Sequence, residues 1–212
     1  MAEPHPRILV LAGTNGAGKS SIGGALLRQS GGEYFNPDEL ARAMRARHPG
    51  LDRETANGRA WALGRRLLEE AIRDRHDFAF ETTLGGNTIT RLLFEACRQG
   101  FEVWIWYAGL DDPERHIARV AARVSQGGHD ISERDIRARY DQSRVNLVRL
   151  LPHVAELLVY DNSAEADPAA GSTPTPVLVL HLRRGTIVGP ADLEHTPSWA
   201  RAIVAAARRE TA

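Results

Sequence analysis

The sequence has very little cysteine and lysine, no long apolar run, and no excess of charge of either sign. Among its 212 residues Cys97 is the only cysteine, which excludes an internal disulfide, a thiolate zinc site and a Cys-x-x-Cys redox pair. No apolar run approaches the roughly 18 residues of a membrane span, and the first residues show neither the basic flank nor the apolar stretch of a signal peptide. We therefore expect a cytoplasmic protein without a membrane segment.

Basic and acidic residues balance, with 27 of each, so the formal net charge is zero. This balance argues against a surface built to hold nucleic acid, and it makes a nucleic-acid end kinase a poor candidate. The basic residues are 26 arginines and one lysine, Lys19. Because lysine is a slim point charge and arginine a wide planar fork, we expect Lys19 to occupy a position that arginine does not fit.

Apolar runs and helical patterns alternate along the chain, which predicts an α/β fold in a single domain over residues 1–212. Strands are expected at residues 7–12, 34–36, 78–82, 102–109 and 157–160, and helices from about residue 19 and from residue 37, then at 55–75, 88–99, 113–126 and 132–151. This alternation indicates a parallel five-stranded sheet with helices on both faces. After an exposed loop at 161–176, a β hairpin at 177–188 and a helix at 198–209 are expected to close the chain.

The stretch GTNGAGKS matches the phosphate-binding pattern G-x-x-x-x-G-K-[ST], and it lies between a predicted strand and a predicted helix as that pattern requires. Glycines let backbone N–H groups surround phosphate oxygens, the lysine reaches the outer phosphates, and the hydroxyl holds Mg²⁺. The alternative is a glycine turn that only joins strand to helix. We assign ATP binding to Gly13, Thr14, Asn15, Gly16, Ala17, Gly18, Lys19, Ser20 and Ser21, with Ser20 also a ligand of Mg²⁺.

P-loop proteins usually carry an acid at the end of a second buried strand, where it holds Mg²⁺ directly or through water. Glu81, which ends the run FAFE, is the best match, and Thr82 and Thr83 follow it as candidate substrate contacts. The alternative is that Glu81 caps the next helix. Asp111, at the end of the predicted strand 102–109, is a rival, although its place before a helix already explains it.

Asp38 follows the predicted strand 34–36 in the motif N-P-D. In a doubly wound sheet, ligands bind in the crevice at the carboxyl ends of the strands. A carboxylate there would orient and deprotonate an attacking hydroxyl, and the neighbouring Asn36 would contact the substrate, as would Glu81. The alternative is that Asp38 is the N-cap of a helix that starts at Glu39.

Six arginines lie between residues 119 and 144, on two predicted helices of a lid at about residues 113–150 that are hinged at Gly127 and Gly128. Two such helices would form a lid that closes over phosphates and meets the charge that builds on the transferring group. The alternative is a solvated face, since an arginine-rich sequence places arginines on every surface. We expect about two of the six to be functional; the six are Arg119, Arg123, Arg134, Arg137, Arg139 and Arg144.

With these motifs the sequence resembles the zeta toxin family of P-loop kinases, in particular its stand-alone members, which are often described as predicted ATPases. The resemblance covers about residues 7–163 and rests on LAGTNGAGKSS, FNPDELA, FETTLGG and RVAARVSQGGHDISERDIRARYDQSRVNL. It implies that Asp38 is the general base and that Lys19 and Ser20 contact ATP and Mg²⁺. It also implies that Arg123, together with Arg134 or Arg137, is a lid arginine.

Zeta toxins use ATP to phosphorylate a hydroxyl of UDP-N-acetylglucosamine, so the resemblance implies a small-molecule kinase with that sugar nucleotide as a candidate acceptor. It also implies a small helical antitoxin as a partner. The chain departs from the family in lacking an obvious long insertion after the FETT strand, where the family binds its substrate. The alternative function is an ATP-binding regulatory protein, or slow NTPase, that acts through a protein partner.

Overall fold

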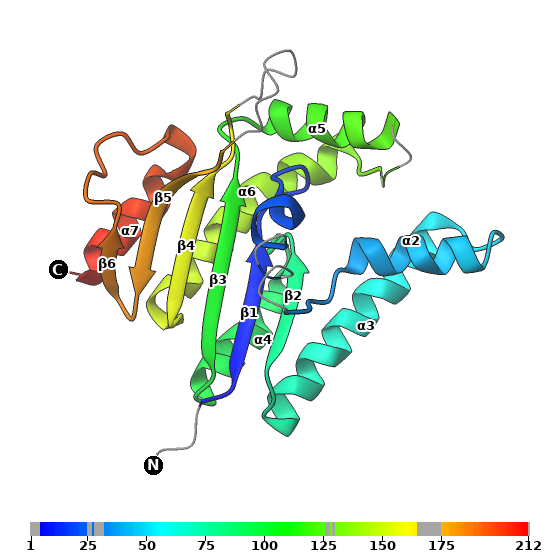
Figure 1. Ribbon diagram of the computed structural model, residues 1–212, viewed down its shortest axis with the longest axis horizontal. Coiled ribbons are helices and arrows are strands. Elements are labelled where there is room, and N and C mark those ends of the chain that lie inside the picture. Colours follow the sequence, from blue (N-terminus) through cyan, green and yellow to red (C-terminus); the bar gives the residue numbers. More distant parts are fainter. Residues whose placement is uncertain are drawn as a thin grey trace.

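The structure is a computed structural model that describes residues 5–24, 27, 32–125, 128, 130–164 and 175–211. In this part of the chain six strands form one sheet in the order β2-β1-β3-β4-β5-β6 (Figure 1). The neighbours among the first four in this order are parallel, and β5 and β6 are antiparallel additions. The strands are β1 (Arg7–Ala12), β2 (Phe78–Thr82), β3 (Glu102–Gly109), β4 (Glu156–Asp161), β5 (Val177–Arg183) and β6 (Thr186–Gly189).

The sheet differs from the expected five parallel strands in two ways. The predicted strand 34–36 is reduced to one bridge, in which Phe35 accepts from the N–H of Glu81 and donates to the carbonyl of Ala79, both at 2.8 Å. It cannot extend into a longer ladder because Asn36 already caps the next helix. The predicted hairpin, by contrast, extends the sheet, since β5 pairs antiparallel with β4.

The helices that the structure describes lie close to the predicted ranges. The first predicted helix is described only as a five-residue π-helical turn, Ser20–Gly24. In Figure 1, α2 and α3 form an arm beside the β2 edge of the sheet, and α5 lies beyond the carboxyl ends of the strands. The α-helices are α2 (Pro37–Arg47), α3 (Arg53–Asp74), α4 (Asn87–Arg98), α5 (Pro113–Ser125), α6 (Glu133–Leu150) and α7 (Arg201–Thr211).

The main core lies between the sheet and α4, α6 and α7. Alternate residues of the central strands, such as Val10 in β1 and Ile105 in β3, are fully buried in it. On the other face the backbone of the turn 20–24 approaches closely, because a Cβ at Gly23 would lie 2.6 Å from Leu11 Cδ2 and 3.2 Å from Trp106. Helical segments therefore cover both faces, as predicted. None of the described helices has the length and apolar character that a bilayer crossing requires.

The predicted lid range of about 113–150 includes half a helix that belongs to the core. Ser143, Asn146, Leu147 and Leu150 of α6 are all fully buried, and the two leucines are part of the main core cluster. A lid movement would therefore be confined to α5 and the first two turns of α6, because moving the rest would open the core.

Candidate active site

The phosphate-binding loop runs from the end of β1 to the turn 20–24, and its glycines adopt conformations that other residues avoid. The φ angles of Gly13, Gly16 and Gly18 are 137°, 82° and 87°, values at which only glycine is unstrained. There is also no room for side chains: a Cβ at Gly16 would lie 2.8 Å from the carbonyl oxygen of His116, and one at Gly13 would collide with the carbonyl of Ala108. The loop shape thus requires the glycines at the motif positions, and a glycine loop of this kind before a helical turn is the usual binding place of phosphate oxygens.

Glu81, at the end of β2, lies against this loop. Its Oε2 accepts hydrogen bonds from Ser20 Oγ at 2.7 Å and from Asn36 Nδ2 at 3.2 Å, and its Oε1 lies 3.5 Å from Lys19 Nζ, with the side chains of Lys19 and Glu81 only 7% and 10% exposed. The alternative that Glu81 caps the next helix is wrong, because Gly86 is the N-cap of α4.

Ser20 and Glu81 offer a hydroxyl and a carboxylate, which are hard oxygen ligands of the kind that Mg²⁺ prefers. Among the described residues there is no group of three His, Cys, Asp or Glu side chains that could hold a metal ion. A magnesium ion at this place would therefore need the phosphate oxygens of a nucleotide as further ligands, which is its usual mode of binding in phosphoryl-transfer proteins.

Asp38 lies in the first turn of α2 and is not its cap. The N-cap is Asn36, whose Oδ1 accepts from the N–H groups of Asp38 at 2.9 Å and Glu39 at 3.2 Å. The alternative that Asp38 caps this helix is therefore wrong. Instead, Asp38 Oδ2 lies 3.7 Å from Nη1 of Arg123 on α5, so the fold brings together two residues that the sequence analysis selected from distant motifs.

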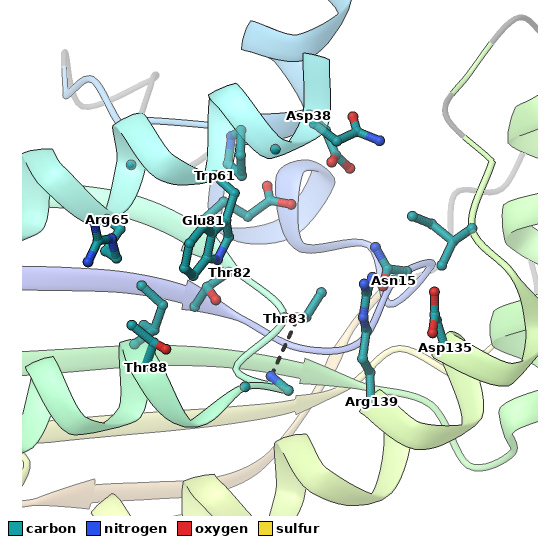
Figure 2. A pocket seen from close by; sticks show the side chains of 18 of the residues that line it. Asn15, Asp38, Trp61, Arg65, Glu81, Thr82, Thr83, Thr88, Asp135 and Arg139 are labelled. Atoms are coloured by element: carbon teal, nitrogen blue, oxygen red, sulfur yellow. Dashed lines mark hydrogen bonds between the residues drawn. The ribbon is translucent and has the colours of Figure 1, made fainter. Parts of the chain in front are cut away.

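A pocket of about 830 Å³ opens next to Asp38, between the helical arm, the end of β2 and the start of α6 (Figure 2). We call it the α3 pocket, because one face of α3 forms much of its wall. Its volume lies in the upper part of the range of about 300–1,000 Å³ for sites that hold drug-sized ligands. The predicted residues Asp38, Glu81, Thr82, Thr83 and Asn15 line it, and α3 contributes Arg53, Glu54, Asn57, Gly58, Trp61, Gly64 and Arg65.

Among the lid arginines, Arg139 is the one that lines the α3 pocket. Its Nη1 donates to Asn15 Oδ1 of the phosphate loop at 2.9 Å. Arg139 is one of the six arginines of the predicted lid, but the family resemblance did not select it. Helical spacing could have done so, because Arg139 lies three and four residues from the buried Ile136 and Ser143, on the inward side of α6.

Arg134 and Arg137, which were selected, lie elsewhere. Arg137 pairs with Glu114 of α5 at 2.6 Å and with Glu133 at 3.9 Å, and the Glu114 carboxylate raises the pKa of Arg137. Arg134 is exposed and makes no hydrogen bond or ion pair within the described chain. Neither residue lines the α3 pocket. Their catalytic role stays a prediction, which this arrangement disfavours because Arg137 already holds α5 and α6 together.

A buried polar network fixes the segment between β2 and α4, which forms part of the pocket wall. Ser143 Oγ donates to the carbonyl of Thr83 at 2.6 Å and lies 3.0 Å from the hydroxyl of Tyr107, and burial raises the pKa of Tyr107 to about 12. Asn146 Nδ2 donates to the carbonyl of Leu84 at 2.8 Å, a buried residue whose φ of 55° is unusual for leucine. The core half of α6 thus holds this wall in one conformation.

His116 of α5 supports the phosphate loop from the lid side. Its Nδ1 lies 2.8 Å from the carbonyl oxygen of Asn15, and because a carbonyl only accepts, Nδ1 carries the proton. Its Nε2 has no hydrogen-bond partner in the described structure. Burial lowers the pKa of His116 to about 4, so the ring is neutral near pH 7. No motif or spacing in the sequence singles out His116.

The zeta toxin family model matches residues 1–167. A functionally uncharacterised protein of Haemophilus influenzae is 32% identical over 139 residues, which are 63% of this chain and 92% of that protein. A chain in the crystal structure of the AvrRxo1-ORF1:AvrRxo1-ORF2 complex superposes with a TM-score of 0.66 at 15% identity, over 97% of this chain and 71% of that chain. A further structure of that complex contains ATP. The PezAT toxin–antitoxin system of Streptococcus pneumoniae gives a TM-score of 0.56 at 16% identity, over 82% of this chain and 75% of that chain. At such identities the solved structures show a shared fold.

Proposed function

We propose that this chain, which belongs to the zeta toxin family, is a kinase that transfers the γ-phosphoryl group of ATP to a hydroxyl of a small molecule bound in the α3 pocket. The observation that carries the proposal is the position of Asp38. Its carboxylate is not used in capping, it lines a pocket large enough for a second substrate, and that pocket also reaches Glu81 and Asn15 of the phosphate site.

On the nucleotide side, residues 13–21 would hold the phosphates of ATP, and Lys19 would contact the outer ones. Ser20 and Glu81, already within 2.7 Å of each other, would hold Mg²⁺, which when bound neutralises phosphate charge and orients the γ-phosphoryl group. The crystal structure of the AvrRxo1 complex with ATP supports the choice of nucleotide.

On the acceptor side, Asp38 would take the proton of the attacking hydroxyl. The oxygen of that hydroxyl would bond to the γ-phosphorus while the bond between the γ-phosphorus and the ADP oxygen breaks. Arg123 lies close enough to Asp38 to hold the carboxylate in place. Arg139 lines the pocket and donates a hydrogen bond to Asn15 of the phosphate loop. It would stabilise the negative charge that develops on the oxygens of the transferring phosphoryl group. UDP-N-acetylglucosamine and other sugar nucleotides are the first acceptors to test.

We further propose that the protein has an antitoxin partner, as the PezAT system does. Co-expression with the product of a neighbouring reading frame, followed by co-purification, tests this partner separately from the chemistry.

The test of the kinase reaction is Asp38→Asn. Asparagine removes the base but keeps the shape of the side chain. The ion pair that it breaks joins side chains that are 35% and 39% exposed, so its loss should cost less than about 1 kcal/mol of folding stability. Each protein is incubated with labelled ATP and a panel of sugar nucleotides and nucleosides. We expect Asp38→Asn to fold and bind ATP but to lose transfer by about a hundredfold or more.

Glu39→Gln is the matched control, because it removes the neighbouring acid from the same turn of α2 without touching the pocket wall. It should keep the parental rate of transfer. If the parent labels no acceptor and Asp38→Asn turns over ATP as the parent does, the kinase assignment fails and the regulatory ATP-binding protein becomes the better explanation.

A further inference from the structure

Two side chains from outside the phosphate loop contact its backbone carbonyls. Nδ1 of His116 donates to the carbonyl of Asn15 at 2.8 Å, and Nδ2 of Asn162 donates to the carbonyl of Ala17 at 3.0 Å. Asn162 follows the last residue of β4 and is only 7% exposed. The proposed transfer reaction does not use this buried amide, although it lies directly against the nucleotide site.

The hydrogen bond from Asn162 fixes the direction of an N–H group in the loop. A trans peptide unit is planar, so its C=O and N–H groups point in opposite directions. A donor that holds the carbonyl of Ala17 therefore turns the N–H of Gly18 to the opposite side, away from Asn162. Gly18 is a fixed glycine of the phosphate-binding motif, and phosphate oxygens bind to the N–H groups of such a loop.

The contact between Asn162 and the loop is tight, because a Cβ at Gly18 would collide with Nδ2 of Asn162. The backbone of Asn162 is held as well. Its N–H donates to the carbonyl of Gly109 at 2.9 Å, and its carbonyl accepts from Nη2 of Arg119 at 2.8 Å. The side chain of Asn162 therefore reaches the loop from a fixed backbone, which leaves the carbonyl of Ala17 little freedom to turn.

The residue before Asn162 is anchored to the C-terminal part of the chain. Oδ1 of Asp161 accepts from Nε1 of Trp199 at 3.1 Å. Trp199 is 4% exposed, and its ring fills the space that a side chain at Gly109 would need. It lies in the short turn before α7, outside the part of the chain that the zeta toxin model matches. A contact from beyond the family match thus reaches the end of β4 beside the phosphate loop.

We propose that Asn162 is a positioning residue of the nucleotide site, which turns the N–H of Gly18 towards the phosphates of ATP, and that Trp199 keeps Asn162 in place through Asp161. The C-terminal segment therefore contributes to phosphate binding. This inference rests on the proposed function, since it takes the loop to be the binding site of ATP, and it assigns part of the affinity for phosphate to two residues outside the loop.

The test measures binding and needs no transfer. The parent, Asn162→Ala and Trp199→Phe are titrated by calorimetry, in the presence of Mg²⁺, with a non-hydrolysable ATP analogue and with inorganic tripolyphosphate. Asn162→Ala removes the donor, so we expect both ligands to bind about tenfold more weakly, the scale of one lost hydrogen bond. Trp199→Phe keeps an aromatic ring but loses the indole N–H, and it should weaken the binding of both ligands about threefold.

A double variant separates positioning from a general loss of stability. If Trp199 acts through Asn162, Trp199→Phe should weaken binding no further in the Asn162→Ala background, whereas independent effects would multiply. Ile203→Val is the matched control, because Ile203 is a fully buried residue of α7 in the same C-terminal segment. Its substitution should lower the melting temperature by a few degrees without changing the affinity for either ligand.

Four results would overturn the positioning role of Asn162. Asn162→Ala could bind both ligands as tightly as the parent, or it could lose affinity for the ATP analogue alone, which would place Asn162 at the base or the ribose. Ile203→Val could weaken binding as much as Asn162→Ala does, or the parent could fail to bind tripolyphosphate. Independent effects in the double variant would overturn the part assigned to Trp199.

The positioning role and the kinase reaction fail in different ways. If acceptors are phosphorylated but Asn162→Ala leaves the affinity for both ligands unchanged, the positioning role is wrong while the kinase reaction stands. If both affinities depend on Asn162 as expected but no acceptor is ever phosphorylated, the positioning role stands and the kinase reaction is wrong.

Discussion

Acidification should destabilise this protein through His116. The ring is 1% exposed, and burial is the main cause that lowers its pKa from 6.5 to about 4. The hydrogen bond to the Asn15 carbonyl opposes this shift, and the nearby cations Lys19, Arg119 and Arg144 each lower the pKa by a smaller amount. His116 therefore binds a proton near pH 6.5 in the unfolded chain, but only near pH 4 in the folded protein. The contribution of His116 to the free energy of unfolding is complete above pH 6.5 and is lost as the pH falls from 6.5 to 4. Below about pH 4 this contribution no longer changes.

The size of the effect follows from the shift. A difference of about 2.5 pKa units corresponds to about 3 kcal/mol, at about 1.4 kcal/mol per unit. Because a domain of this kind has a total stability of about 5–15 kcal/mol, a loss of this size is readily measured. Other groups titrate in the same range, so the contribution of His116 has to be isolated by substitution.

The assay is urea unfolding at pH 7.5, 6.5, 5.5 and 4.5 for the parent, His116→Phe and His195→Gln. Phenylalanine cannot bind a proton, so His116→Phe should be less stable at pH 7.5, where it lacks the bond to Asn15, but should lose about 2–3 kcal/mol less on acidification. His195 is 90% exposed, and its substitution should leave the pH dependence of the parent unchanged. If the parent and His116→Phe lose the same free energy between pH 7.5 and 4.5, the buried neutral histidine does not explain the acid sensitivity.

Two further predictions concern the nucleotide end of the site. Lys19→Ala should weaken Mg²⁺–ATP binding about 10- to 100-fold in calorimetry, the scale of a lost charged hydrogen bond of about 1.5–3 kcal/mol, and an unchanged affinity would show that the loop does not hold phosphate through this residue. Arg139→Ala should lower kcat about a hundredfold with little effect on ATP affinity, whereas Arg137→Ala, which loses only its pairs with Glu114 and Glu133, should change kcat less than about twofold. Equal effects of the two substitutions on kcat would indicate that the lid arginines form a solvated surface and that Arg139 has no special role in transfer.

Most strands and helices follow from local sequence patterns and could therefore be predicted from the sequence. The strands β1, β2, β3 and β4 are apolar runs that end at glycine, threonine or polar residues, and their alternation with helical patterns leaves few arrangements other than a parallel sheet. The edge at Phe35 could not be predicted, because the same short segment favours a strand and the N-cap of a helix, and the cap at Asn36 prevails. Pairing of the hairpin with β4 is a long-range contact that no local pattern encodes.

The residues of the candidate site likewise fall into those that local motifs indicate and those that depend on the tertiary arrangement. The phosphate loop, Glu81 and Asp38 are contiguous motifs at strand ends, so residue type and position sufficed to select them. The wall of the α3 pocket could not be selected, because Trp61 and Arg65 look like ordinary surface residues of an amphipathic helix until the direction of that helix relative to β2 is known. Arg139 differs from Arg137 only in helical phase, and the phase acquires meaning once the buried face of α6 is identified.

The glycines of α3 provide a last test of which molecule the pocket holds. Gly58 lies in the pocket wall, and a Cβ built on it meets no atom within 4 Å. Gly58→Ala should therefore stabilise the helix by up to about 1 kcal/mol, and Gly58→Leu nearly as much, because leucine and alanine have similar helix propensities. Gly64 differs, since its Cβ would lie 2.6 Å from Cε1 of Phe35, and Gly64→Ala should gain nothing.

Only Gly58→Leu puts a large side chain into the α3 pocket, so it should raise the KM for the acceptor at least about tenfold while leaving ATP affinity and the melting temperature at the values of Gly58→Ala. Both variants gain the same helix stability from replacing glycine. The difference between their acceptor KM values therefore reports only the effect of filling the pocket. Equal acceptor KM values for Gly58→Ala and Gly58→Leu would mean that the acceptor reaches Asp38 by another route and that the α3 pocket is not its binding site.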